Sequence, residues 1–450
     1  MMKSINFLLI VAMITIGVTG CTTSNQPATH PSWTRNAVMY EVNTRQITPE
    51  GTFAALSREL PRLKEAGVDI LWFMPIYPIG EVGRKGTLGS YYSIKDYTAV
   101  NPEFGTLADF QACVDKAHQL GMRVMLDWVA AHTSRDAVWL SHYDWYHRNE
   151  DGSPAYLYDW SDVARLNYDN TQMRQAMLDA MLFWLKEAHI DGFRCDMADL
   201  TPIDFWNWAV PQLKQANPDL FMLAESESPA VTEQAFDAFY AWTVHHTLNS
   251  IARGEKNVDS LRHVWQELRQ KFGPNAVPLL FTSNHDENSW SGSEYERMGG
   301  AVRQMAVLTH LLPGMPLIYT GQEVGNRKRL AFFEKDTVSA DAPLEMTAFY
   351  KTLTSFKKAS PALAEPPYGG MMEELTTDYP AWTYAFKRCL EEDCVLALFN
   401  FSAEAVTLRL VDAAVDGTYV PMEGGDALTV SAATEWYMEP YGYKVYKIQK

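Results

Sequence analysis

Apolar and polar positions along the chain follow two alternating patterns. Apolar residues three or four positions apart indicate amphipathic helices, and short continuous apolar runs between them indicate buried strands. The apolar run VDILWFMPI, for example, directly follows a helical stretch that ends in Gly. The predicted strands cover residues 37–46, 68–76, 123–129, 191–197, 220–225, 236–242, 277–284 and 315–321. The predicted helices cover residues 52–67, 107–121, 171–189, 202–216, 257–271, 296–312 and 344–359.

This alternation predicts one large α/β domain over residues 33–360. Strands that alternate with helices imply a parallel sheet, and eight such units favour a closed (β/α)8 TIM barrel. The alternative is an open doubly wound sheet, but no Gly-rich dinucleotide fingerprint follows the first strand. The stretch 132–170 is irregular and rich in Trp, Tyr and Asp. We expect it to form a short excursion after the third strand.

The pattern changes after residue 360. Runs such as CVLALFNF, VTLRL and YGYKVYKI are strand-like and are separated by Gly and Asp turns. Short strands with such turns are typical of antiparallel β structure. Residues 361–450 are therefore predicted to form a C-terminal β-sandwich. Cys389 and Cys394 flank a turn between two of these strands. They could form a disulfide across the hairpin, or they could remain two free thiols.

The N-terminus predicts export. Lys3 precedes an apolar run that is too short to span a membrane permanently, so residues 1–20 have the form of a signal peptide. Small residues that end in Cys21 resemble the lipobox of bacterial lipoproteins, which would make Cys21 the lipidated first residue, carrying acyl chains such as palmitate. Residues 21–32 are predicted to be a polar tether. The expected location is the bacterial cell envelope, through a lipid anchor; an ordinary secretory signal is the alternative.

Composition narrows the range of partners. The 450 residues carry a net charge of −17, and 47% of them are hydrophobic, which allows one large core with a smaller domain. A nucleic-acid partner is not expected, because phosphate binding needs basic patches. An acidic surface rich in Trp and Tyr suits a neutral, polyhydroxylated ligand, although the charge also serves solubility alone. A monomer is favoured.

Polar side chains recur at the carboxyl ends of the predicted strands. Arg194 and Asp196 are two positions apart, so they point to the same face of one strand. The other strand ends contribute Asp127, His132, Glu225, His285 and Asp286. Catalytic residues of a TIM barrel lie at this end, and carboxylates that converge there repel one another. Such repulsion favours a chemical use for the set as a whole, whereas a capping role stays open for any single residue.

Two carboxyls across a cleft, one ionised and one protonated, are what glycosidic cleavage requires. We expect the guanidinium of Arg194 to keep Asp196 ionised. Metal-assisted hydrolysis is the competing use of clustered Asp and His residues. It would need His pairs at metal-ligand spacing, and no such spacing is found.

At these residues the sequence resembles a known family. The segments DWVAAH (127–132), GFRCD (192–196), LAES (223–226) and SNHD (283–286) resemble, in order and spacing, the four signature regions of the α-amylase family of glycoside hydrolases. YYSIKDYTAVNPEFGT (91–106), RLNYDN (165–170) and PLIYTGQE (316–323) resemble further conserved loops of that family. The resemblance spans about residues 37–335.

The resemblance implies roles for individual residues. It makes Asp196 the nucleophile, Glu225 the general acid/base, and Asp286 the carboxylate that orients the sugar. It also implies a glucose-binding subsite with Asp127 orienting its shell and Asp96 securing the loop that carries Tyr92. The implied substrate-binding residues are Tyr92, Asp96, Asp127, His132, Arg194 and His285. The family reaction retains anomeric configuration through a glycosyl-enzyme.

One position departs from the family pattern. Ala131 stands where calcium-dependent members have an Asn ligand, and a methyl group cannot coordinate Ca²⁺. No metal and no cofactor are therefore expected. The implied function is cleavage of α-glucosidic bonds, mainly α-1,4, in starch-derived glucans or maltooligosaccharides. The alternatives are a transglycosylase or α-glucosidase with the same site, and a catalytically silent glucan-binding surface protein.

Overall fold

The computed structural model describes residues 30–338, 344–411, 415–431 and 433–449. The predicted signal peptide and the lipidation site at Cys21 lie outside the described residues. No helix in the described ranges is both long and apolar enough to cross a membrane.

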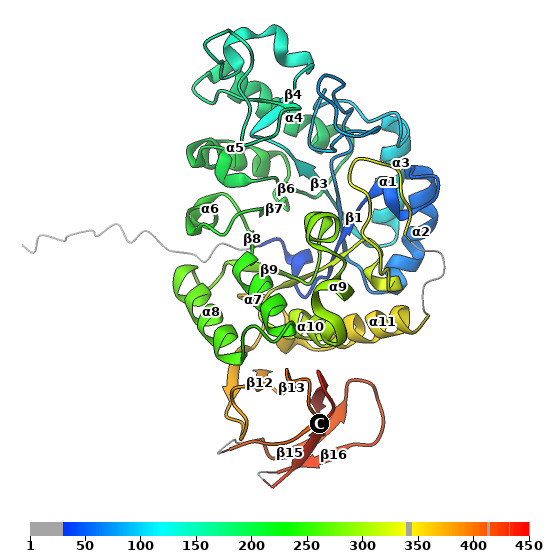
Figure 1. Cartoon of the computed structure of the whole chain (residues 1–450), viewed down its shortest axis with the longest axis vertical. Coiled ribbons are helices and arrows are strands. Elements are labelled where there is room, and N and C mark those ends of the chain that lie inside the picture. The colour runs from blue at the N-terminus through cyan, green and yellow to red at the C-terminus, as the bar shows by residue number, and fades with distance from the viewer. Residues whose placement is uncertain (1–29, 339–343, 412–414, 432, 450) are drawn as a thin grey trace, which may run out of the picture.

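The first domain is a closed barrel of eight parallel strands (Figure 1). The strand order around the barrel is β1-β10-β9-β8-β7-β6-β3-β2. Each strand lies inside a range that the apolar runs predict, so the TIM-barrel prediction is confirmed. The strands are β1 (Met39–Val42), β2 (Ile70–Phe73), β3 (Arg123–Trp128), β6 (Gly192–Cys195), β7 (Phe221–Ala224), β8 (Ala238–Tyr240), β9 (Val277–Phe281) and β10 (Met315–Tyr319).

Helices connect the strands and cover the outside of the barrel. The helices are α1 (Thr44–Ile47), α2 (Phe53–Glu65), α3 (Leu107–Gln119), α4 (Thr171–Glu187), α5 (Ile203–Ala216), α6 (Pro229–Gln234), α7 (Trp242–Ala252), α8 (Val258–Lys271), α9 (Glu294–Met298), α10 (Val302–Leu311) and α11 (Leu344–Lys358). The sequence analysis did not predict α1, α6 or α7. Its helix 296–312 is two helices, with Gly299 at a positive φ of 53° at the break.

Local sequence sets several helix starts. The Thr106 side chain accepts a hydrogen bond from the Asp109 backbone N–H, and the Asp109 carboxylate accepts one from the Thr106 backbone N–H. This capping box satisfies two otherwise unpaired donors at the start of α3. Inside the barrel, large apolar side chains such as Trp72, Phe221 and Phe281 fill the interior, so the barrel is a packed core and not a pore.

The excursion after β3 is present as predicted. Its ends pair through β4 (His132–Ser134) and β5 (Val163–Arg165), which form a two-stranded antiparallel sheet. Figure 1 shows this segment at the end of the molecule farthest from the C-terminal domain.

The C-terminal domain is an antiparallel β-sandwich, as the sequence predicts. A six-stranded sheet of order β11-β12-β13-β18-β15-β16 lies with a two-stranded sheet, β14-β17, and a shared core contains Leu396, Leu408 and Trp436. Cys389 and Cys394 oppose each other in the β12–β13 hairpin and form a disulfide. The strands are β11 (Met371–Leu375), β12 (Thr383–Leu390), β13 (Asp393–Asn400), β14 (Val406–Arg409), β15 (Gly417–Pro421), β16 (Leu428–Val430), β17 (Glu435–Met438) and β18 (Tyr443–Ile448).

The first described residues are fixed to the barrel. His30 Nδ1 lies 3.1 Å from Oδ1 of Asp237, and His30 Nε2 lies 2.7 Å from the carbonyl oxygen of Asn275. Asp237 and Asn275 precede β8 and β9, so the chain enters at the amino-terminal ends of the strands. His30 and Pro31 are buried, although the predicted tether extends to residue 32.

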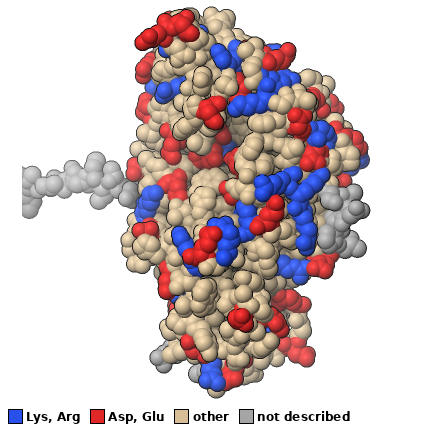
Figure 2. All heavy atoms as spheres, in the orientation of Figure 1, with Lys and Arg blue, Asp and Glu red and all other residues tan. Residues whose placement is uncertain are grey.

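Charged side chains of both signs intermingle on the surface. On the face drawn in Figure 2, acidic and basic groups alternate over most of the area, and acidic groups also line a central hollow. On this face the acidic groups therefore do not form one continuous patch.

Candidate active site

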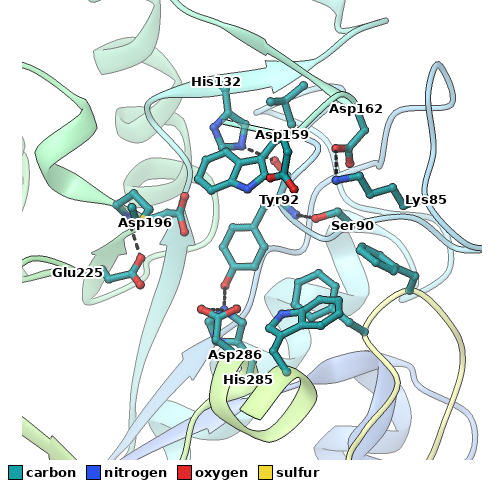
Figure 3. Close-up of a pocket in the computed structure, with 16 residues that line it drawn as sticks. Lys85, Ser90, Tyr92, His132, Asp159, Asp162, Asp196, Glu225, His285 and Asp286 are labelled. Atoms are coloured by element: carbon teal, nitrogen blue, oxygen red, sulfur yellow. Dashed lines mark hydrogen bonds and ion pairs between the residues drawn. The ribbon is translucent and has the colours of Figure 1, made fainter. Parts of the chain in front are cut away.

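The carboxyl ends of the barrel strands surround a cleft of about 380 Å³ (Figure 3). Its size suits a small-molecule site. Six of the nine predicted catalytic and substrate-binding residues line it: Tyr92, His132, Asp196, Glu225, His285 and Asp286. The other lining residues are Lys85, Ser90, Asp159, Trp160, Asp162, Val163, Met197, Trp290, Phe332 and Phe333.

Arg194 lies beneath the cleft and bridges its carboxyl groups. Its Nη1 lies 3.0 Å from Oδ1 of Asp196 and 2.9 Å from Oδ1 of Asp127, and its Nη2 lies 2.8 Å from Oε2 of Glu225. The contact with Asp127 follows from the sheet, because Asp127 on β3 pairs in register with Arg194 on β6. One fully buried guanidinium therefore holds three carboxyls, two more than the sequence analysis assigned to it.

The backbone after Asp196 is fixed in an unusual conformation. Met197 has φ 39° and ψ 53°, in the left-handed region that costs free energy for a residue with a side chain. In this conformation its N–H donates a 2.8 Å hydrogen bond to Oε2 of Glu225. The hydrogen bond from Met197 and the ion-pair contact from Arg194 thus both meet Oε2, and Oε1 is left as the oxygen that can carry a proton.

Burial controls the protonation of the two bridged carboxyls. Burial, opposed by the Arg194 charge and assisted by Asp196 and Asp286, raises the pKa of Glu225 to about 7. Burial also raises the pKa of Asp196 to about 6, although Arg194 acts to lower it. Arg194 thus limits the rise of the Asp196 pKa without cancelling it. Both carboxyls therefore hold a proton to higher pH than they would in water, as a general acid must.

Asp127 supports the cleft from below and does not line it. It is fully buried, and its Oδ2 accepts hydrogen bonds from Trp72 Nε1 at 3.2 Å and from the Tyr92 hydroxyl at 3.1 Å. Burial raises the pKa of Asp127, and the Arg194 charge opposes the rise. Asp127 therefore orients Arg194 and Tyr92, in the position that the resemblance implies.

His285 connects the opposite wall to the barrel interior. Its Nδ1 lies 2.5 Å from Oε1 of Glu41, and its Nε2 lies 2.7 Å from the Tyr92 hydroxyl and 3.4 Å from Oδ2 of Asp286. Burial favours the neutral ring, but the charges of Asp286 and Glu41 raise the pKa of His285 to about 9. A protonated His285 donates on both sides and places a positive charge beside Asp286. Sequence analysis did not identify Glu41. The one feature that could have pointed to it is a carboxylate in the middle of an otherwise apolar strand.

His132 presents an unpaired nitrogen in the cleft wall. Its Nε2 donates to the carbonyl oxygen of Tyr92 at 3.1 Å, while its buried Nδ1 has no partner among the described residues. Burial lowers the pKa of His132 to about 4, so the ring is neutral and Nδ1 is a free acceptor. A hydroxyl group of a ligand is the donor that this atom lacks.

Asp96 is not in the cleft. Its Oδ1 accepts hydrogen bonds from the backbone N–H and the hydroxyl of Thr98, both at 2.9 Å. These bonds close a local turn, so the structure places Asp96 apart from the other substrate-binding candidates.

Aromatic side chains that the sequence analysis did not single out form the rim of the cleft. Trp290 is 54% exposed, and its ring lies 5.2 Å from that of Phe332 and 5.6 Å from that of Phe333. An ion pair between Lys85 and Asp162, 3.3 Å apart, forms another part of the wall. Apolar rings beside polar groups are suited to a sugar, which has both apolar faces and hydroxyl edges.

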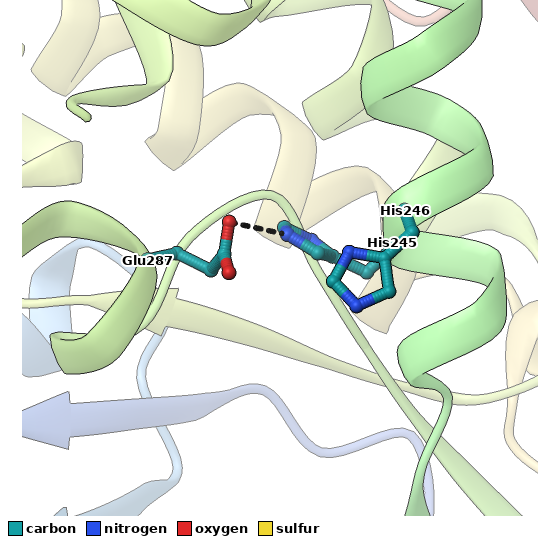
Figure 4. Close-up of side chains that lie close together, drawn as sticks. All are labelled: His245, His246 and Glu287. Atoms are coloured by element: carbon teal, nitrogen blue, oxygen red, sulfur yellow. Dashed lines mark ion pairs between the residues drawn. The ribbon is translucent and has the colours of Figure 1, made fainter. Parts of the chain in front are cut away.

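The position of the absent Asn ligand offers little to a cation. Ala131 is buried, and its carbonyl oxygen accepts the Leu166 N–H at 3.1 Å. Within the described ranges, His245, His246 and Glu287 are the one group close enough to share an ion (Figure 4). However, Glu287 Oε2 already lies 3.1 Å from His245 Nε2 and 3.7 Å from Arg297 Nη1, which accounts for its charge.

The barrel and its carboxylate-lined cleft define the class of (β/α)8-barrel glycoside hydrolases. The sequence profile described as "Alpha amylase, catalytic domain" matches residues 24–160 and 143–357. The chain belongs to the α-amylase family.

Similar proteins agree with this assignment. An α-amylase from Lactobacillus plantarum superimposes with a TM-score of 0.83 at 30% identity, over 92% of this chain and 99% of that chain. A noncanonic maltogenic α-amylase, AmyB, from Thermotoga neapolitana superimposes with a TM-score of 0.84 at 25% identity, over 92% and 99% of the two chains. Alpha-amylase MalA of Haloarcula japonica is 28% identical over 411 residues, covering 88% of this chain; the chain spans 59% of that protein's length.

Proposed function

We propose that this protein is a retaining glycoside hydrolase that cleaves α-1,4-glucosidic bonds in maltooligosaccharides or starch-derived glucans. The observation that carries the proposal is the pair of cleft carboxyls, Asp196 and Glu225, that one buried guanidinium bridges. A retaining reaction needs a carboxylic acid to protonate the leaving oxygen and a carboxylate to attack the sugar carbon.

In this proposal, each step is carried out by a particular residue of the cleft. Asp196 attacks the anomeric carbon, while Glu225 gives its proton to the departing glucosyl oxygen. Glu225 then takes a proton from the water that releases the sugar from Asp196. Asp286, held by the charged His285, stabilises positive charge on the ring in both transition states. His132 accepts a hydrogen bond from a sugar hydroxyl.

Product analysis tests the proposal. The protein is incubated with maltooligosaccharides, soluble starch, pullulan and sucrose, and the first products are identified with their anomeric configuration. We expect shorter maltooligosaccharides in the α-configuration from the first two substrates, and no products from Asp196→Asn. β-Configured first products, or full activity of Asp196→Asn, would contradict the mechanism. Transfer of the glycosyl group to a sugar acceptor uses the same intermediate. Products longer than the starting maltooligosaccharide would show that transfer takes place.

Calcium removal is expected to leave activity unchanged. The Asn ligand is replaced by Ala131, and the nearby backbone oxygen is already bonded. Dialysis against EDTA should therefore change neither the turnover of maltooligosaccharides nor the melting temperature. A large loss of either one that added Ca²⁺ restores would show that another site binds the ion.

We further propose that the protein is a lipoprotein of the bacterial cell envelope, anchored through Cys21. The sequence VTGC at the end of the apolar segment supports this proposal. Acyl chains contribute about 0.8 kcal/mol of membrane affinity for each buried CH₂. Wild-type protein should partition into the detergent phase, whereas Cys21→Ser should be soluble or unprocessed. Wild-type protein found wholly in the aqueous phase would contradict the anchor.

A further inference from the structure

A second cavity lies between the barrel and the C-terminal domain, remote from the catalytic cleft. It has a volume of about 400 Å³ and lies between α8, the loop that leads to β9, and β11. Its walls include Asn275 and Pro278, at the amino-terminal end of β9. Asp286 follows the carboxyl-terminal end of the same strand, so the two cavities open at opposite ends of the barrel.

Much of this cavity is apolar. The rings of Phe239 and Phe272 stack with centroids 3.6 Å apart and an angle of 7° between their planes. Pro366 and Pro367 form another part of the wall. Met371 is 76% exposed at the rim, and a flexible thioether side chain adapts readily to the shape of a ligand. The cavity therefore suits a molecule with an apolar body.

Two side chains on α8, Trp265 and Arg269, bring hydrogen-bond donors to this cavity. Trp265 is 5% exposed, and its Nε1–H has no hydrogen-bond partner among the described residues. A buried donor without a partner costs free energy, which a ligand acceptor would recover. Arg269 adds an exposed guanidinium one helical turn further along α8. Neither side chain carries a negative charge.

Arg388 adds a buried positive charge to the same cavity. It is 1% exposed and donates to the carbonyl oxygens of Gly370, Leu311 and Ala364. These contacts use carbonyl dipoles, and no carboxylate of a described residue lies within 4.0 Å of its nitrogens. Burial lowers the pKa of Arg388 to about 9, and Glu365 opposes this effect only partly. The charge is thus poorly compensated.

No Asp or Glu residue is among the described residues that line the cavity. The charged residues that line it, Arg269 and Arg388, are both basic, whereas the chain as a whole has a net charge of −17. We propose that the cavity binds a small organic anion: a carboxylate or sulfonate attached to an apolar ring or alkyl chain. The anionic group meets Arg269, Arg388 and the Trp265 N–H, while the apolar body packs against Phe239, Phe272 and Met371.

Occupancy of this site would join the two domains. One wall belongs to α8 of the barrel and another to β11 of the C-terminal domain, so the ligand contacts both. A ligand that binds only the folded protein raises its stability by mass action. The ligand is therefore expected to raise the melting temperature without entering the catalytic cleft.

The binding experiment uses 8-anilinonaphthalene-1-sulfonate, a fluorescent sulfonate with an apolar body, on the full folded chain. We expect saturable binding of one dye per chain. Decanoate should displace the dye and raise the melting temperature, whereas 1-decanol at the same concentration should do neither, because it lacks the charge. Equal displacement by decanol, or the absence of saturable binding, would overturn the proposal.

Variants locate the bound dye. Arg269→Gln and Trp265→Phe each remove a donor while keeping most of the side-chain volume, and each should weaken binding about tenfold. Arg58→Gln, which changes an exposed arginine on α2, is the matched control and should bind as the wild type does. Unchanged affinity in both cavity variants would overturn the proposal. Loss of binding in Trp290→Ala would also overturn it, because the dye would then occupy the catalytic cleft.

Discussion

Replacing Glu225 with Gln is expected to reduce the hydrolysis of maltooligosaccharides by about 10²–10⁴-fold. The amide keeps the size of the side chain but has no proton to give to the leaving oxygen. The structure places the hydrogen bond from the Met197 N–H and the ion-pair contact from Arg194 Nη2 at Oε2, so the substitution removes the acid at Oε1 with little change in the surrounding contacts.

Two comparisons separate this explanation from simple disruption of the cleft. An aryl glucoside with a good leaving group needs no proton, so Glu225→Gln should still form the glycosyl-enzyme from it. Glu227→Gln is the matched control, because Glu227 lies two residues away and accepts hydrogen bonds from Thr243 outside the cleft. Wild-type turnover of maltooligosaccharides by Glu225→Gln would exclude Glu225 as the acid.

Replacing Arg194 with Ala is expected to move both limbs of the pH–rate profile to higher pH. The guanidinium lowers the pKa of Asp196 and of Glu225 against the effect of burial. Without it both pKa values rise, so Asp196 becomes protonated and inactive at a pH where the wild type works. Glu225, in turn, keeps its proton to higher pH. The measurement is kcat/KM against pH on one maltooligosaccharide. The profile of Arg194→Lys is expected to lie between those of the wild type and Arg194→Ala, because Lys keeps the charge but not the planar fork.

The same substitution is expected to destabilise the fold. Removing one member of a buried ion pair costs about 3–5 kcal/mol, because the remaining charges lose their partner. Arg297→Ala is the control: Arg297 is also buried and bonded, but it does not contact the cleft carboxyls. Arg297→Ala should lower the melting temperature without moving the acidic limb of the pH–rate profile. An Arg194→Ala profile that falls equally at every pH would show that Arg194 only positions the cleft.

The features that sequence predicts best are those repeated along the chain. Strands buried on both faces give continuous apolar runs, so β2, β3 and β9 are visible without a structure. A charged residue at the end of such a run is conspicuous, and Asp196, Glu225 and Asp286 were found in this way. Helix α7 was missed because TVHHTLNSIA has polar residues on the face that closes over β9 and buries His245 and Asn249.

Contacts between distant segments could not be predicted. The pairing of Arg194 with Glu225 joins β6 to the end of β7, and the pairing of Glu41 with His285 joins residues 244 positions apart. Both depend on how far the strands are staggered, which an apolar run does not report. The rim of Trp290, Phe332 and Phe333 depends on two loops that meet only in the folded chain. Asp96 does not line the cleft, and its carboxylate closes a turn with Thr98 in the loop that carries Tyr92.

The place where the chain joins the barrel has a practical consequence. Because His30 is fixed at the amino-terminal ends of the strands, a support coupled to the chain at this residue would lie at the end opposite the cleft. An enzyme immobilised on a bead or an electrode through residue 30 would therefore present the cleft outward, where a long polysaccharide in solution can reach it. Attachment through a side chain of the excursion after β3 would instead turn the cleft toward the support and restrict the enzyme to short substrates.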